Sequence, residues 1–246
     1  MKRTLWTTLI AVLGFALILL ARFPATWAAA ALPKGVSCAQ VAGTVWYGSC
    51  AGLVAQGVTV GDVSWELHAS RLFRGKLAAY LDITRGEHFV RGDVEASSGS
   101  LITASNVQAD LPLDRAYIPQ LPANLSGHVS AFLQLLRVEK GVLTAVQGHV
   151  EAHDLVERGT QTTELGSYSV DFPAADARSE PVGRLASLSG PLDVQGTLRL
   201  TRAPGYVVEG QVAAGPGAAP QLVQQLQYLG TPDAQGKRPF SVEGTF

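Results

Sequence analysis

Apolar and polar residues alternate along most of the chain, which is typical of strands that bury one face of a sheet. The clearest rows are Leu77, Ala79, Leu81 and Ile83, then the odd positions from Leu101 to Leu111, then those from Val129 to Leu135. Gly, Pro, Asn or Asp interrupt the alternation about every 8–12 residues, as the turns of a multi-stranded antiparallel protein do. The pattern therefore predicts one long, curved, antiparallel sheet.

Further strands are predicted at 142–153, 164–172, 182–189, 191–201, 206–213 and 239–246. The apolar positions change from even to odd numbers between Val60 and Val63, which predicts a β-bulge at Gly61-Asp62. The stretch 112–122 carries three prolines and predicts a crossover loop. Leucines at helical spacing within 220–229 predict a short amphipathic helix that packs on the sheet.

The first segment of the chain is different, because an uncharged apolar run from Leu5 to Ala21 follows Lys2 and Arg3. As a helix, this run would reach about 26 Å, close to the thickness of the hydrocarbon layer. We expect residues 1–27 to form a cytoplasmic tip and a transmembrane signal anchor, since the positive charges precede the run. Residues 28–246 would then form a periplasmic β-rich domain. The alternative is cleavage within 28–31, whose small residues resemble a signal-peptidase site.

The fold predicted from these patterns is mainly β: an N-terminal transmembrane helix, one long curved antiparallel sheet and a short C-terminal helix. Composition agrees, because 26 Gly and 13 Pro favour strands and turns over a helical bundle. With 19 basic and 20 acidic residues, the net charge is −1. No basic excess is available to neutralise phosphates, which argues against nucleic acid as the main partner.

The two cysteines, Cys38 and Cys50, lie shortly after the apolar run. In an oxidising compartment such as the periplasm, their spacing favours a structural disulfide across a hairpin. Two unpaired thiols in the core are the alternative. The pair lacks Cys-x-x-Cys spacing, so it indicates neither a zinc site nor a redox motif.

A search for catalytic motifs finds neither a nucleophile elbow nor a glycine-rich dinucleotide turn. On a strand, His149 and His153 would sit roughly 13 Å apart, too far to share a metal ion. We assign them, and carboxylates such as Asp110 and Asp171, to the solvated face. The sequence therefore predicts no enzyme, no cofactor and no metal site. The five histidines are His68, His88, His128, His149 and His153.

The order of several short motifs resembles the protein N family of the bacterial type II secretion system. These motifs are Arg22–Ala25, Gly43–Gly48, Leu165–Tyr168, Gly190–Leu192 and the C-terminal stretch Leu226–Phe246. The resemblance implies a non-enzymatic accessory subunit at the inner membrane that contacts platform subunits or the secretin. The family is also similar to envelope proteins whose long curved sheets accommodate lipid. An envelope protein that binds lipid or another hydrophobe in an apolar groove is therefore the alternative function.

Four residues in these motifs are candidates for contact with a partner: Trp46, Tyr47, Leu229 and Phe240. Each also has a purely structural interpretation. Trp46 would then be buried in a hairpin, and Leu229 would belong to a capped helix end. A periplasmic hydrolase is a third function class, which only a convergence of Ser or Asp with His in a closed pocket would support.

Overall fold

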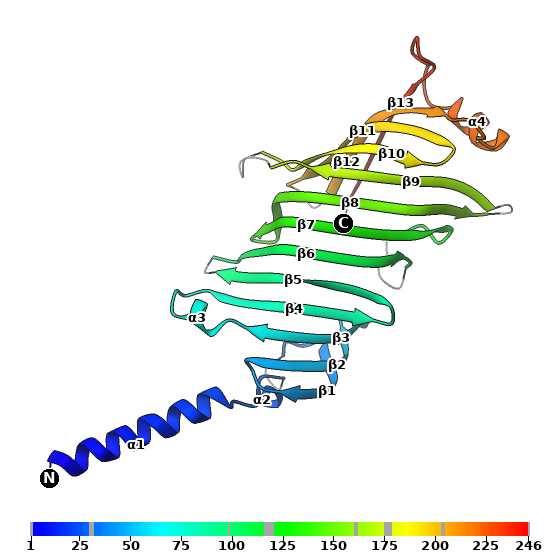
Figure 1. The fold of residues 1–246 in the computed structure, drawn as a ribbon. Helices are drawn as coiled ribbons and strands as arrows, with labels where there is room; N and C mark the ends of the chain where they lie inside the picture. The colour runs from blue at the N-terminus through cyan, green and yellow to red at the C-terminus, as the bar shows by residue number, and fades with distance from the viewer. Residues whose placement is uncertain are drawn as a thin grey trace.

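The computed structural model describes residues 2–29, 32–97, 99–115, 121–159, 162–174, 179–202 and 205–245. Over these residues the chain forms one 13-stranded antiparallel sheet, in which every strand is hydrogen-bonded to the next strand in sequence (Figure 1). The sheet confirms the predicted mainly β, antiparallel fold.

The first seven strands are β1 (Val36–Gly43), β2 (Tyr47–Ala55), β3 (Val58–Leu67), β4 (Leu77–Arg85), β5 (His88–Ser97), β6 (Leu101–Leu113) and β7 (Leu125–Glu139). The others are β8 (Val142–Arg158), β9 (Thr162–Phe172), β10 (Val182–Ser189), β11 (Leu192–Thr201), β12 (Gly205–Ala214) and β13 (Arg238–Thr245). The helices are α1 (Lys2–Ala21), α2 (Ala25–Ala29), α3 (Ala69–Leu72) and α4 (Pro220–Leu226).

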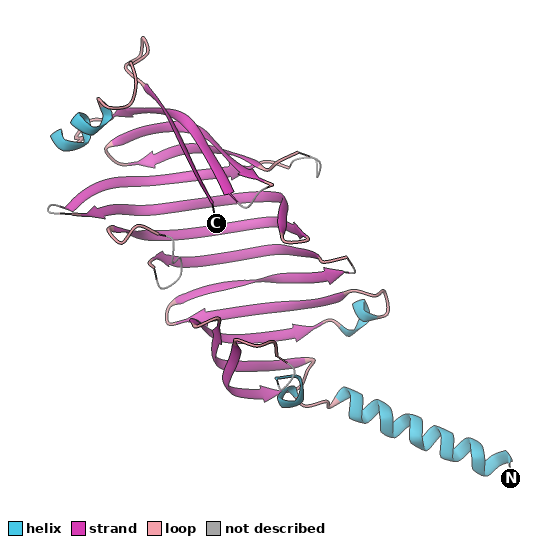
Figure 2. Ribbon diagram, turned by 180° about the vertical axis from the view of Figure 1, so that it is seen from behind, coloured by secondary structure: helices cyan, strands magenta, loops and turns pink. Residues whose placement is uncertain are grey.

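The sheet is an open single layer. Figures 1 and 2 view the sheet from opposite sides and show no covering sheet or helical layer on either long face, while α1 projects away from the β1 end. The accessible surface of 15857 Å² exceeds the roughly 10,500 Å² expected for a compact monomer of 25.9 kDa. Few apolar side chains are buried among the described residues: Ala25, Cys50, Ala78, Val146, Phe172, Val194, Val212 and Leu222.

Cross-strand pairing gathers apolar residues on one face. Directly opposed partners on neighbouring antiparallel strands share a face, so a chain of partners can be followed across the sheet. One such chain of partners runs from β1 to β13, contains no polar residue and ends at Phe240. Its members are Val41, Cys50, Val63, Ile83, Val90, Ala109, Ala131, Val150, Val170, Leu185, Gly196, Gly210 and Phe240, which we call the apolar row.

The predicted bulge in β3 is present, but it lies at Val60-Gly61, one residue before the predicted Gly61-Asp62. Leu53 pairs with Gly61 but Val54 pairs with Thr59, so β3 carries an extra residue. The φ angle of Gly61 is +121°, and a Cβ there would lie 2.3 Å from the Thr84 carbonyl oxygen. Only glycine fits this position without displacing backbone.

The predicted row of odd positions from Leu101 to Leu111 is wrong. Ala104 and Ala109 pair with Val94 and Val90, which share a face, although the two alanines are an odd number of residues apart. Asn106 adopts a left-handed conformation with φ of 53° and provides the bulge that changes the alternation. The predicted odd positions before the bulge, 101, 103 and 105, therefore lie on the polar face of the sheet.

Three other expectations are corrected. The stretch 112–122 does not cross over, because β6 and β7 are adjacent; residues 116–120 lie outside the described part of the chain. The C-terminal helix ends at Leu226, with Leu222 buried against the sheet. Across the described residues, no helix has both the length and the apolar character needed to cross a membrane, so the transmembrane helix expected in the first 27 residues is not supported.

We predict that Gly61→Ala destabilises the protein by about 2 kcal/mol or more, because it adds a backbone clash to the strain of a positive φ. Gly86→Ala is the matched control, since Gly86 also has a positive φ but its Cβ would meet nothing within 4 Å. Urea denaturation of both variants measures the difference. Equal midpoints would show that the bulge tolerates a side chain.

Candidate functional site

The apolar face is hollowed at the N-terminal end of the sheet, over β1 to β5. The hollow has a volume of about 460 Å³, and every residue that lines it is apolar. Trp65 is the largest of these, and its indole N–H is satisfied by the Val45 carbonyl at 3.0 Å. Ala25 of α2 closes one side and is 1% exposed. A surface of this kind can bind only an apolar partner.

The first hairpin attaches α1 to the sheet beside this hollow. Trp46 lies in the turn between β1 and β2, and its indole N–H donates to the Leu20 carbonyl in the last turn of α1 at 2.8 Å. The Val45 N–H donates to the Phe23 carbonyl at 2.9 Å, and Pro24 forms a β-bridge with Thr44. The indole thereby adds a second, shorter hydrogen bond to a carbonyl at the helix end, which also accepts from the Phe23 N–H at 3.4 Å.

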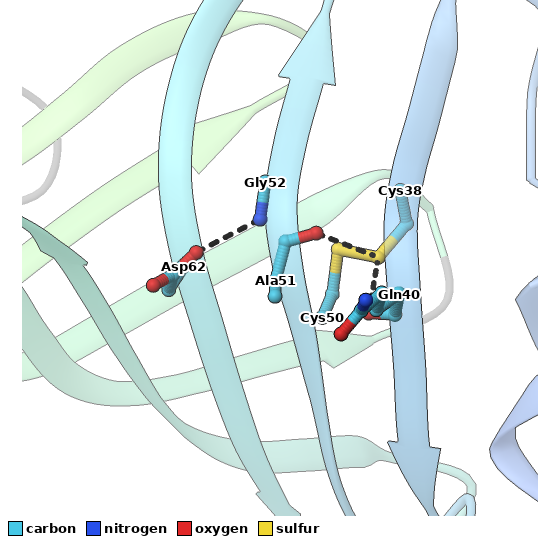
Figure 3. Close-up of a disulfide and its surroundings, with 6 residues drawn as sticks. All are labelled: Cys38, Gln40, Cys50, Ala51, Gly52 and Asp62. Atoms are coloured by element: carbon cyan, nitrogen blue, oxygen red, sulfur yellow. Dashed lines mark hydrogen bonds between the residues drawn. A yellow bond between two sulfur atoms is a disulfide. The ribbon is translucent and has the colours of Figure 1, made fainter.

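The structure contains the expected disulfide between Cys38 and Cys50, with Cα atoms 5.8 Å apart (Figure 3). The bridge is diagonal, because Cys38 lies opposite Leu53 and Cys50 opposite Val41. Gly52, between these positions, has a φ of 66°, and its N–H donates to Asp62 Oδ1 at 2.8 Å. Both half-cystines line the hollow, so the bridge fixes its wall.

The four candidate contact residues do not form one site. Trp46 and Tyr47 lie beside the hollow, and Tyr47 is 62% exposed. Leu229 and Phe240 lie at the opposite end of the sheet, where both are half-buried. Phe240 belongs to the apolar row, so that row connects its end of the sheet with the hollow.

The other face of the sheet carries a group of paired histidines and carboxylates that sequence reasoning missed. Glu151 accepts from His149 Nε2 at 2.7 Å and lies 3.0 Å from His153 Nε2 through its other oxygen. His149 also bonds to Asp171 on β9. One carboxylate therefore joins two histidines whose strand positions alone place them far apart.

A second group lies on β5, β6 and β7. Asp110 Oδ1 is 2.9 Å from His128 Nε2 and 3.5 Å from His88 Nδ1. The hydrogen bond from His128 holds the pKa of the Asp110 carboxyl below its usual value of 3.8. Hairpin symmetry is the signal that could have found this group, since residues equally far from a turn become neighbours.

Comparison with known proteins gives a family. Residues 34–241 match the family described as Type II secretion system (T2SS), protein N. The chain belongs to this family. It is 27% identical to the type II secretion system protein N of Vibrio cholerae serotype O1, over 87% of this chain and 86% of that protein.

A second relative is the type II secretion system protein N of Aeromonas hydrophila, which is 28% identical over 96% of this chain and 95% of its own length. No solved structure matches the chain. The family resemblance seen in the sequence motifs is therefore confirmed, and it makes this member a component of a type II secretion system.

In this family member, we predict that replacing both Cys38 and Cys50 by alanine lowers the free energy of unfolding by about 3 kcal/mol, the loop-closure entropy for a 12-residue separation. Urea denaturation measures the loss. Thiol labelling of the denatured, unreduced wild-type protein provides the check on pairing. It should detect no free cysteine, and two labelled thiols would disprove the bridge.

The His149 imidazole should titrate above its usual pKa of 6.5, because its protonated form donates hydrogen bonds to the Glu151 and Asp171 carboxylates. These hydrogen bonds therefore stabilise the folded protein. Their contribution to the free energy of unfolding is complete below pH 6.5 and is lost as the pH rises through the raised pKa of His149 in the folded state. A histidine NMR titration measures that value. Glu151→Gln should lower it, and a wild-type pKa of 6.5 or less would contradict the assignment.

Proposed function

We propose that the protein is a non-enzymatic accessory subunit of the type II secretion system. Its sheet would lie in the periplasm and contact other subunits of the machine, either at the inner-membrane platform or toward the secretin. In this role it supports the export of folded proteins across the outer membrane.

The observation that carries this proposal is the family match over residues 34–241, which includes the whole sheet except its last few residues. The open single-layer fold supports a scaffolding role. The uncovered sheet has an accessible surface of 15857 Å², which is well above that of a compact protein of the same mass. It therefore leaves a large area available for contact with other subunits. Tyr47 and Tyr228, 62% and 90% exposed, present aromatic side chains near opposite ends.

We further propose that residues 5–21 hold the protein at the inner membrane, with residues 28–246 on the periplasmic side. This rests on the uncharged apolar run of the sequence. Side chains described on α1 support it: Trp6, Val12 and Ile18 are each more than 60% exposed and, at helical spacing, lie on three different sides of the helix. Large apolar groups exposed all around a helix need an apolar environment.

Photo-crosslinking in intact cells tests the role. A photoreactive residue replaces Tyr47 in one variant and Tyr228 in another, and crosslinked proteins are identified after extraction in mild detergent. We expect other secretion subunits to be recovered from at least one position, and loss of the gene to reduce export of a type II substrate. Normal export together with no crosslinked secretion subunit would refute the proposal.

The same extracted protein tests the anchor. N-terminal sequencing should begin at Met1 if the apolar run is retained. A start near Ala29 would show that the segment is a cleaved signal peptide, and the membrane attachment would then be refuted while the secretion role stands.

A second candidate function is lipid or hydrophobe binding, which the wholly apolar hollow favours. Phospholipid should then co-purify with the wild-type protein. Ala79→Glu would place a charge in the hollow and abolish this, whereas Ser64→Glu, on an exposed position of the polar face, would not. Lipid recovered equally with both variants would argue against the hollow.

A further inference from the structure

Two imidazoles and one carboxylate converge on three neighbouring strands, away from the apolar hollow. They belong to His88 on β5, Asp110 on β6 and His128 on β7. One ligand atom from each lies within 4.8 Å of the other two. Among the described residues, this is the one such group of three histidine, cysteine or acidic side chains.

The spacing of these atoms fits a bound transition metal. Zinc binds nitrogen and oxygen at about 2.0–2.2 Å, so neighbouring ligand atoms of a tetrahedral site are about 3.3 Å apart. Asp110 Oδ1 lies 2.9 Å from His128 Nε2 and 3.5 Å from His88 Nδ1, on either side of that value. The two imidazole rings are tilted by 48°, with centroids 5.8 Å apart, and so do not block each other by stacking.

The sheet holds the three backbones in place. Phe89, next to His88, pairs with Asp110, and Pro112 pairs with His128, so each ligand lies at or next to a paired ladder position. A ligand set carried on paired strands is positioned more accurately than one on loops. The side chains are 29%, 36% and 36% exposed, which leaves a path for an ion and room for water ligands.

We propose that His88, Asp110 and His128 bind one divalent transition metal ion of the zinc class. Two imidazoles and one carboxylate suit zinc, nickel, copper or ferrous iron, whereas magnesium and calcium prefer oxygen ligands. The remaining coordination positions are open to water or to a side chain of a bound subunit. The site lies about midway along the chain of strands, where a metal would fix β5, β6 and β7 to one another.

Zinc titration of the full-length, metal-free protein in detergent tests this site. Wild type should bind one equivalent of Zn²⁺ in competition with a chromogenic chelator, and excess Mg²⁺ should not displace it. Asp110→Asn and His128→Gln should each weaken binding at least about ten-fold. His68→Ala is the matched control, because His68 faces a single carboxylate, Asp93, at 4.0 Å; it should bind as wild type does.

A measurement on the wild-type protein avoids any doubt about the folding of variants. Zn²⁺ should protect His88 and His128, but not His68, from modification by diethyl pyrocarbonate, as read by mass spectrometry. No zinc binding by wild type would overturn the proposal. So would unchanged affinity in Asp110→Asn, or equal protection of all five histidines.

Discussion

Backbone hydrogen bonding between each strand and the next is the interaction on which the whole structure depends. A two-layer protein gains much of its stability from the core between its layers. In the part of the chain that the structure describes, no second layer covers the sheet and few side chains are buried. The fold therefore depends on thirteen strands holding their register, and every feature that sets register, such as the bulge at Gly61, matters for the surfaces on both faces.

Strand positions could be predicted because a period of two is a local property of sequence. Strands such as β9, β10 and β13 were located within about two residues, and the family was recognised from short motifs. The bulge at Asn106 could not be predicted, since a left-handed asparagine leaves no mark beyond a polar residue in a row. The His88, Asp110 and His128 group also escaped prediction, because it appears only when the register of two hairpins is known together.

The helix contact, the disulfide and the apolar hollow all lie at the N-terminal end of the sheet. The Trp46 indole bonds to the end of α1, the disulfide braces β1 against β2, and both border the apolar hollow. A force on α1 would therefore reach the sheet first through the β1–β2 turn. Because every strand is hydrogen-bonded only to its sequence neighbours, the β1 end can be strengthened without stiffening the far end, and the disulfide does this locally.

The two faces of the sheet differ in chemistry, but the same strand register determines both of them. A slip of one residue between strands would exchange the faces, bringing carboxylates and histidines into the apolar row. Bulges change the alternation at chosen points without such a slip, as at Gly148, where φ is +146° and a Cβ would lie 2.4 Å from the Phe132 carbonyl oxygen. Gly148 precedes His149 of the polar face and is followed by Val150 of the apolar row. The bulge at Gly148 thus places His149 for its pairing on the polar face and keeps Val150 in line with the apolar row. A partner bound to either face would therefore stabilise the strand register on which both faces depend.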